Sequence, residues 1–338
     1  MITTFDDLRP AAANMLKVNM GVKAGERVLF VSDAPAPKDR QRSSSLLETV
    51  TLRAMMTQRI SKMMAEEYPD CTVDFLGFHA TYQHGAEPPT NVAEAILEYD
   101  VVFLMTHFSL SHTAARQSGT DKGVRIASMP GVEAYMFNAD GPMNADYEAD
   151  NVDCVAWAEK LTQGSQVHIT TPSGTDLRFS IEGRAGNIDN GLYSKTGDWG
   201  NLPAGEAYVS PIEGSAEGVL VVPAGWYPGL NEEMNMTFEG GYVAALDGGG
   251  EVGAHFIEVF DFNNEAHKHR RNCAELGVGT NSLARRPDNV LEAEKIKGTI
   301  HIGIGDSSHM GGVTESDSHE DFVLIDPTLV IDGKRAIG

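Results

Sequence analysis

The sequence is poor in cysteine and in positive charge. Its three cysteines, Cys71, Cys154 and Cys273, are widely spaced among 338 residues. They therefore offer no disulfide framework, no CxxC pair and no thiolate zinc site. Lysine and arginine total 26 against 48 acidic residues, which gives a formal net charge of −22. Nucleic acids and anionic membranes are bound by clustered lysine and arginine, so this balance argues against both as partners.

Long apolar runs are also lacking. The longest runs, such as residues 101–105, are far too short to cross a bilayer. The first residues, MITTFDDLRPAAANML, carry two early aspartates and no apolar stretch of the kind found in signal peptides. We therefore expect a soluble, cytoplasmic protein.

The chain length suggests about two domains, and the first half alternates between two patterns. Short, continuous apolar runs predict buried strands over 27–32, 72–78, 101–106 and 124–128. Apolar residues at helical spacing predict helices over 52–63, 91–98 and 146–160. Strands that alternate with helices predict a parallel sheet, so we expect an N-terminal α/β domain over residues 1–164.

The second half has a different residue pattern, in which short apolar runs are separated by Gly, Pro, Asn and Asp. These runs predict strands over 167–171, 177–181, 206–209, 218–222, 234–238, 242–246, 298–304 and 322–325. A helical patch is expected over 264–274, and Asp332-Gly333 predicts the turn of a closing hairpin. We expect a β-rich α+β domain over residues 165–338 that binds metal and carries the catalytic site.

Two potential metal ligands lie just before an apolar run. His319 and Asp321 are two residues apart, so on a strand their side chains share one face. An imidazole and a carboxylate in that position can bind one metal ion together. The alternative is an ordinary polar strand entrance that faces solvent.

Three further polar residues lie in apolar, glycine-rich settings. His301 lies on a predicted strand whose same-face neighbours are glycines, which leaves room beside the ring for a metal or a substrate. Glu206 and Glu275 are acids among small and apolar residues, where an unpaired charge is costly. A core histidine bonded to a carbonyl, a helix cap or a salt bridge would also explain these residues singly.

Charge balance indicates what these five residues would bind. One divalent ion against Glu206, Glu275 and Asp321 leaves about −1, and two ions with a bridging hydroxide bring the set to about zero. Oxygen and nitrogen ligands without thiolate suit Zn²⁺, Mn²⁺, Co²⁺ or Fe²⁺. We expect two divalent ions per chain, which would activate a bridging water and polarise a carbonyl.

The motifs in the second half resemble those of the aminopeptidase T group of metallo-aminopeptidases. The resemblance is carried by residues 201–206 (Asn-Leu-Pro-Ala-Gly-Glu), 274–281 (Ala-Glu-Leu-Gly-Val-Gly-Thr-Asn), 298–305 (Gly-Thr-Ile-His-Ile-Gly-Ile-Gly) and 319–321 (His-Glu-Asp). It implies a two-domain, homodimeric hydrolase of a short peptide or small amide. It also implies a dinuclear site with Glu206, Glu275, His301, His319 and Asp321 as ligands.

The chain departs from the aminopeptidases after His301. They have an active-site tyrosine there, whereas residues 306–310 read Asp-Ser-Ser-His-Met. The chain also resembles the 2,5-dihydroxypyridine dioxygenases, around residues 215–218 and at the final His-x-Asp. In those enzymes two histidines and one carboxylate hold a single Fe²⁺. They carry histidine in place of Glu275 and lack the ligands at Glu206 and His301.

Two other histidines are predicted to act as catalytic acids or bases. His112 follows a buried strand and aligns roughly with an active-site histidine of the dioxygenases, and His309 lies where the aminopeptidase tyrosine is missing. The alternatives are a histidine at a helix N-terminus without a role for His112 and a simple loop residue for His309. Arg116 is a candidate for binding a substrate carboxylate, and Asp317 for orienting His319.

Three functions are compatible with these patterns, and we expect the first of them. The first is a dinuclear metal-dependent aminopeptidase-like hydrolase that acts on a short peptide or small amide. The second is a non-haem Fe²⁺ dioxygenase that opens hydroxylated N-heterocycles. The third is a catalytically inactive relative that keeps the metal ligands.

Overall fold

The computed structural model describes residues 4–338, which form two compact units. Unit 1 contains the described residues up to Tyr147 together with Gly191–Ala204, and unit 2 contains Glu148–Asn190 and Gly205–Gly338. The units therefore change near residue 147, ahead of the position 164 indicated by the sequence. The segment Gly191–Ala204 returns to unit 1 because its strand extends the sheet of that unit.

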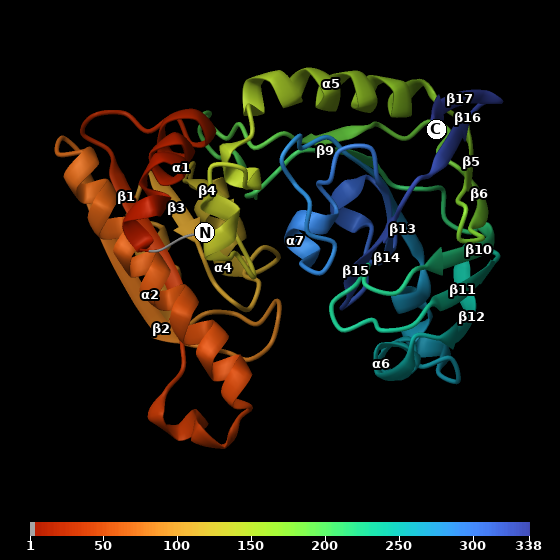
Figure 1. Cartoon of the computed structure of the whole chain (residues 1–338), viewed down its shortest axis with the longest axis horizontal. Helices are drawn as coiled ribbons and strands as arrows, with labels where there is room; N and C mark the ends of the chain where they lie inside the picture. The colour runs from red at the N-terminus through yellow and green to blue at the C-terminus, as the bar shows by residue number, and fades with distance from the viewer. Residues whose placement is uncertain (1–3) are drawn as a thin grey trace. The chain divides into compact units, whose positions relative to one another are not determined.

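Unit 1 is built on a five-stranded parallel sheet in the order β2-β1-β3-β4-β8 (Figure 1). Its strands are β1 (Arg27–Ala34), β2 (Thr72–His79), β3 (Val101–Leu104), β4 (Arg125–Ser128) and β8 (Trp199–Asn201). The first four match the strands expected from continuous apolar runs, as is typical of a sheet buried on both faces. The predicted parallel α/β architecture is confirmed.

Helices flank this sheet. Leu29 and Val31 of β1 share a buried core with side chains of α3 and α4, while α2 packs against β1 and β2. The helical segments of unit 1 are η1 (Phe5–Leu8), α1 (Arg9–Asn14), η2 (Met15–Asn19), η3 (Pro37–Gln41), α2 (Ser44–Glu67), α3 (Thr90–Ile96), α4 (Ala114–Asp121), η4 (Ala134–Phe137) and η5 (Pro142–Asn144). None of the helices within residues 4–338 is long and apolar enough to cross a membrane.

Unit 2 contains two antiparallel sheets. The seven-stranded sheet has the order β12-β11-β10-β6-β5-β16-β17, and the five-stranded sheet has the order β15-β14-β13-β9-β7. The strands are β5 (Gln166–Thr170), β6 (Asp176–Ser180), β7 (Asn187–Asp189), β9 (Glu206–Val209), β10 (Glu217–Val222), β11 (Met234–Glu239), β12 (Tyr242–Gly248), β13 (Cys273–Gly279), β14 (Ile300–Gly305), β15 (His319–Leu324), β16 (Thr328–Ile331) and β17 (Lys334–Ile337).

One apolar core holds the two sheets of unit 2 together. It contains Ile169 and Phe179 of the seven-stranded sheet and Leu276, Ile302 and Phe322 of the five-stranded sheet. Helix α5 (Tyr147–Gln163) lies along the outside of the unit and adds side chains to this core (Figure 1). The remaining helical segments are α6 (Gly250–Phe260), η6 (Glu265–Arg271), α7 (Val290–Ala293) and η7 (Ser308–Met310).

One prediction for unit 2 was wrong in detail. The patch expected to be helical over 264–274 is the short η6, after which β13 begins at Cys273. The glycines Gly277 and Gly279 are poor strand formers and hid β13 in the sequence.

The closing hairpin is confirmed. Asp332 and Gly333 join β16 to β17 with φ of 50° and 75°, as a two-residue turn with left-handed backbone requires.

The shared core of unit 2 predicts a stability effect. Ile302 is fully buried between the sheets, so Ile302→Ala should lower the free energy of unfolding by about 2–5 kcal/mol. Urea unfolding would measure this, with the exposed Val313→Ala (76% exposed) as the control expected to stay within about 0.5 kcal/mol of wild type. Equal stability of the two variants would contradict the assigned core.

Candidate metal centre

The five predicted ligands all lie on the five-stranded sheet of unit 2. Glu206 begins β9, Glu275 is in β13, His301 is in β14, and His319 and Asp321 are both in β15. Side chains along these strands point alternately to the two faces of the sheet. The residues next to the ligands point into the apolar core, as Leu276, Ile300, Ile302 and Phe322 do. The ligands therefore share the opposite face of the sheet. Glu275, Gly303 and Asp321 pair directly across three neighbouring strands.

Glu275 lies at the centre of this group. Its Oε1 is 3.4 Å from His301 Nε2, and its Oε2 is 3.3 Å from His319 Nε2. His319 Nε2 is also 3.3 Å from Asp321 Oδ1, and His301 Nε2 is 3.4 Å from Glu206 Oε2. The structure thus brings together all five residues that the sequence indicated.

Two glycines make room for the imidazole rings. A Cβ atom at Gly277 would lie 2.0 Å from His301 Nε2, and one at Gly303 would lie 2.8 Å from His319 Nε2. No side chain fits at either position without displacing the ring above it. Each ring therefore lies against glycine backbone on the neighbouring strand, which explains the glycines at positions 277 and 303.

The orientation of His319 is set by a backbone carbonyl. His319 Nδ1 is 2.7 Å from the carbonyl oxygen of Asp306, which can only accept a hydrogen bond, so Nδ1 carries the hydrogen. In the neutral ring, Nε2 then presents a lone pair to the carboxylates of Glu275 and Asp321. The hypothesis that Asp317 orients His319 was wrong, because Asp317 instead forms two hydrogen bonds of 2.6 Å with Arg270.

Three residues of this site were missed in the sequence. Lys295 is buried, with Nζ 2.5 Å from Glu206 Oε1, 2.8 Å from Glu294 Oε1 and 3.5 Å from Asp189 Oδ2. In the sequence, Glu294 and Lys295 resemble an ordinary charged, exposed segment. The only available signal was their position a few residues before the strand that carries His301.

Burial and charge shift the pKa values of this cluster in opposite directions. Burial raises the pKa of the Glu206 carboxyl to about 7, despite the positive charge of Lys295. Burial alone would lower the pKa of His301, but the hydrogen bond to Glu275 and the charges of Glu206 and Asp321 outweigh it and raise it to about 9. Burial also opposes the charge of Glu275, yet its hydrogen bonds with His301 and His319 hold its pKa below the usual range.

These donors fit a divalent metal ion. Two groups have ligand atoms that all lie within 4.8 Å of one another, namely Glu206, Glu294 and His301, and Glu275, His301 and Asp321. Within residues 4–338, the buried atoms Glu206 Oε2 and His301 Nδ1 find no hydrogen-bond partner. Oxygen and nitrogen donors without thiolate suit Fe²⁺, Mn²⁺, Co²⁺ or Zn²⁺. A cation would relieve the excess of negative charge around His319 Nε2.

The two predicted acid–base histidines come from other segments of the chain than the strands of this cluster. His112 is an exposed residue of unit 1 whose ring meets Trp199 edge-on, with centroids 6.1 Å apart. His309 is exposed in η7 of unit 2. Arg116, a predicted carboxylate binder, is buried, donates to the Ser111 carbonyl and lies over the Trp199 ring. Its guanidinium is thus used in holding its own segment together.

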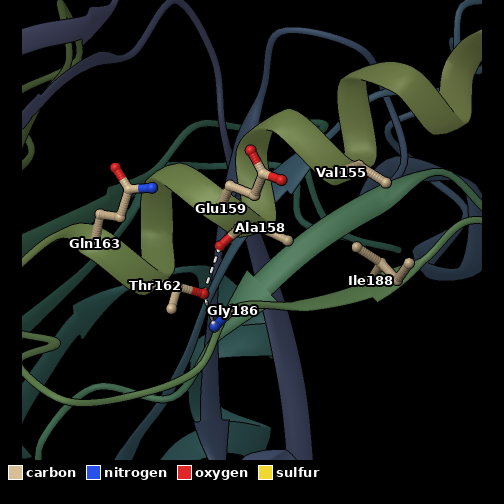
Figure 2. Close-up of a pocket in the computed structure, with 7 residues that line it drawn as sticks. All are labelled: Val155, Ala158, Glu159, Thr162, Gln163, Gly186 and Ile188. Atoms are coloured by element: carbon tan, nitrogen blue, oxygen red, sulfur yellow. Dashed lines mark hydrogen bonds between the residues drawn. The ribbon is translucent and has the colours of Figure 1, made fainter.

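A separate hollow of about 300 Å³ lies between α5 and β7 of unit 2. Figure 2 shows Val155 and Ile188 pointing toward one another across it, and Thr162 bridging the Ala158 carbonyl and the Gly186 amide through two hydrogen bonds of 2.8 Å. Of the residues that line the hollow, only Glu159 is ionisable. The hollow is therefore no alternative metal site.

Known proteins resemble the chain over most of its length. The family model for 2,5-dihydroxypyridine 5,6-dioxygenase (NicX) matches residues 12–338. The 2,5-dihydroxypyridine 5,6-dioxygenase of Pseudomonas putida KT2440 is 22% identical over 204 residues, which cover 56% of this chain and only 57% of that relative.

Two solved structures share the fold. The 2,5-dihydroxypyridine dioxygenase from Pseudomonas putida KT2440 superposes with a TM-score of 0.71 at 18% identity, covering 99% of this chain and 96% of that one. AmpT from Thermus thermophilus superposes with a TM-score of 0.63 at 15% identity, covering 98% and 97%. The architecture of both units is therefore shared with the dioxygenase and with the aminopeptidase.

The glycine beneath His301 gives a first test of the centre. Gly277→Ala should displace the His301 ring and lower the affinity for a divalent metal at least about tenfold, as loss of ligand support does elsewhere. Isothermal titration with Mn²⁺ would measure the change. Gly77→Ala in β2 is the matched control, since its Cβ would make only ordinary contacts of 3.4 Å or more. Unchanged affinity in Gly277→Ala would exclude His301 as a ligand.

Protons should compete with the metal for the same site. The His301 imidazole, with its pKa near 9, holds a proton at neutral pH that must leave before Nε2 can bind a metal. Affinity should therefore rise as the pH increases toward 9, and binding at lower pH should release protons. Titrations with Mn²⁺ in buffers of different ionisation enthalpy would count these protons. A pH-independent affinity without proton release would contradict the assignment.

Proposed function

The chain belongs to the 2,5-dihydroxypyridine 5,6-dioxygenase family, and from this premise we propose that it is a metal-dependent ring-cleaving dioxygenase of a small hydroxylated N-heterocycle. The proposal replaces the aminopeptidase-like hydrolase as the leading interpretation of the sequence, because the family favours the dioxygenase alternative. The substrate class is inferred from the relatives, and 2,5-dihydroxypyridine is the first compound to test.

One observation on this chain carries the proposal. Glu275, His301 and Asp321 have ligand atoms that lie within 4.8 Å of one another, and His319 Nε2, on the same sheet face, is 3.3 Å from Asp321 Oδ1. Two histidines and one carboxylate form the ligand set of non-haem Fe²⁺ oxygenases, which leaves positions open for O₂ and substrate. We propose that this chain builds the set with His301 and His319, and that Glu275, between them, is an additional carboxylate ligand.

The chain's own residues prepare the centre for this chemistry. The Asp306 carbonyl accepts from His319 Nδ1 and so leaves Nε2 free to act as a ligand. Glu275 lies within 3.4 Å of both imidazoles and keeps the rings turned toward one point. A bound Fe²⁺ would supply the activation of O₂. Both atoms of O₂ would enter the substrate as one carbon–carbon bond of the ring breaks, so no external reductant is required.

A hydrolase remains the second candidate for a specific reason. The group of Glu206, Glu294 and His301 is also close enough to hold a metal ion, and two neighbouring ions would favour the hydrolysis of an amide. The fold shared with AmpT agrees with this alternative. The third possibility, a relative that binds metal without turnover, differs from both in having no substrate.

Other predictions from the sequence stand as proposals. His112 and His309 are proposed as the residues that exchange protons with the substrate. A homodimer and a cytoplasmic location are likewise proposed. None of these is required for the metal centre described above.

Oxygen consumption provides the direct test of function. Protein reconstituted with Fe²⁺ under anaerobic conditions should consume one O₂ per 2,5-dihydroxypyridine, followed with an oxygen electrode and by loss of the aromatic absorbance. His319→Ala should reduce the rate at least about 100-fold, because a ligand is lost. His168→Ala is the matched control, since His168 lies on β5 and pairs with Asp176.

The same assays separate the alternatives. Release of an amino acid from a dipeptide or an amino-acid anilide, without O₂ consumption, would establish the hydrolase. Tight metal binding with neither reaction would overturn the proposed dioxygenase for this substrate class.

A further inference from the structure

Lys295 is a fully buried ammonium group in the midst of carboxylates. It is 1% exposed and lies 2.5 Å from Glu206, 2.8 Å from Glu294 and 3.5 Å from Asp189. A buried lysine is stable only when its charge is compensated, and here three acids compensate it. This arrangement is therefore a built ion cluster and not a surface salt bridge.

Backbone contacts hold Lys295 close to the ligand-bearing face of the sheet. The Lys295 amide donates to the Glu292 carbonyl, and its carbonyl accepts from the Asn281 amide. A Cβ atom at Gly279 would lie 2.1 Å from the carbonyl oxygen of Ile296. Only glycine at the end of β13 lets this segment approach the sheet so closely, and the approach brings Nζ to Glu206.

The two groups of potential metal ligands differ in the positively charged partners of their carboxylates. Glu206 and Glu294, in the first group, already bind the Lys295 ammonium. Glu275 and Asp321, in the second group, form ion pairs within the described chain only with His301 and His319. His301 belongs to both groups. In one half of the site the cation is a fixed lysine ammonium, while in the other half the partners of the acids are imidazoles, which can give up a proton and bind a metal ion from solution instead.

We propose that the Lys295 ammonium takes the place of a second metal ion, so that the site binds one divalent ion at Glu275, His301, His319 and Asp321. This inference rests on the metal centre of the proposed function and specifies its metal count. Two-metal hydrolysis needs ions about 3.5–4 Å apart that share a bridging water. An ammonium at Glu206 and Glu294 removes that possibility and leaves the centre suited to single-metal chemistry. Lys295 is in this sense a residue that determines specificity.

Metal counting tests the inference without any measurement of activity. Wild-type protein and Lys295→Met would be loaded with Zn²⁺, desalted and analysed by inductively coupled plasma mass spectrometry, with titration calorimetry in parallel. We expect one ion per wild-type chain and two per Lys295→Met chain. Lys297→Met is the matched control and should bind one ion, since Lys297 is exposed and pairs with Asp153 outside the cluster.

A second variant guards against loss of fold. Lys295→Met leaves Glu206 and Glu294 unpaired, whereas Glu206→Gln in the Lys295→Met background removes one of these charges and one ligand. The double variant should therefore fold and bind one ion, with a circular dichroism spectrum like that of wild type. Two ions per wild-type chain, or a folded Lys295→Met that still binds one ion or none, would overturn the inference.

The outcome is separable from that of the oxygen assay. One ion in wild type and two in Lys295→Met, without O₂ consumption, would support the inference while the proposed function fails. Two ions in wild type together with O₂ consumption would support the proposed function and overturn the inference about Lys295.

Discussion

The alternation of side chains in the five-stranded sheet is the constraint on which the rest of unit 2 depends. Ile300, Ile302 and Ile304 point into the core shared with the seven-stranded sheet, so His301 must point the other way. The same argument applies to β9, β13 and β15. A shift of one residue in any of these strands would bury carboxylates in the core and turn aliphatic side chains toward the ligands. The apolar core thus fixes the register of the metal centre.

The ligand-bearing face of this sheet combines small residues, which leave room for the imidazole rings, with an excess of acidic side chains. Glycines at 277, 279 and 303 allow rings and a neighbouring segment to lie against bare backbone, at the cost of the strand stability that larger residues provide. The acids collected there exceed the positive charge of Lys295. Such clusters persist only when protons or metal ions complete them.

Much of this was accessible from the sequence, and what was missed has physical reasons. The parallel sheet and the closing hairpin follow from local patterns, and so does the choice of the five candidate ligands, because each candidate lies among apolar or small residues. Lys295 and Glu294 belong to an irregular segment, and only tertiary contacts bring them to Glu206. Strand β13 escaped notice because its ligand face is mostly glycine. Asp317 lies two residues before His319 but accepts a hydrogen bond from Arg270. Proximity in the sequence does not reveal this partner.

The return of Gly191–Ala204 to unit 1 has a consequence for biosynthesis. The ribosome releases β5, β6 and β7 of unit 2 before β8, the strand that completes the edge of the sheet in unit 1. The partner of β5 on its other side, β16 (Thr328–Ile331), is synthesised later than β8. Neither unit is therefore complete in the growing chain before part of the other has been synthesised, and no single cut divides the chain into the two units.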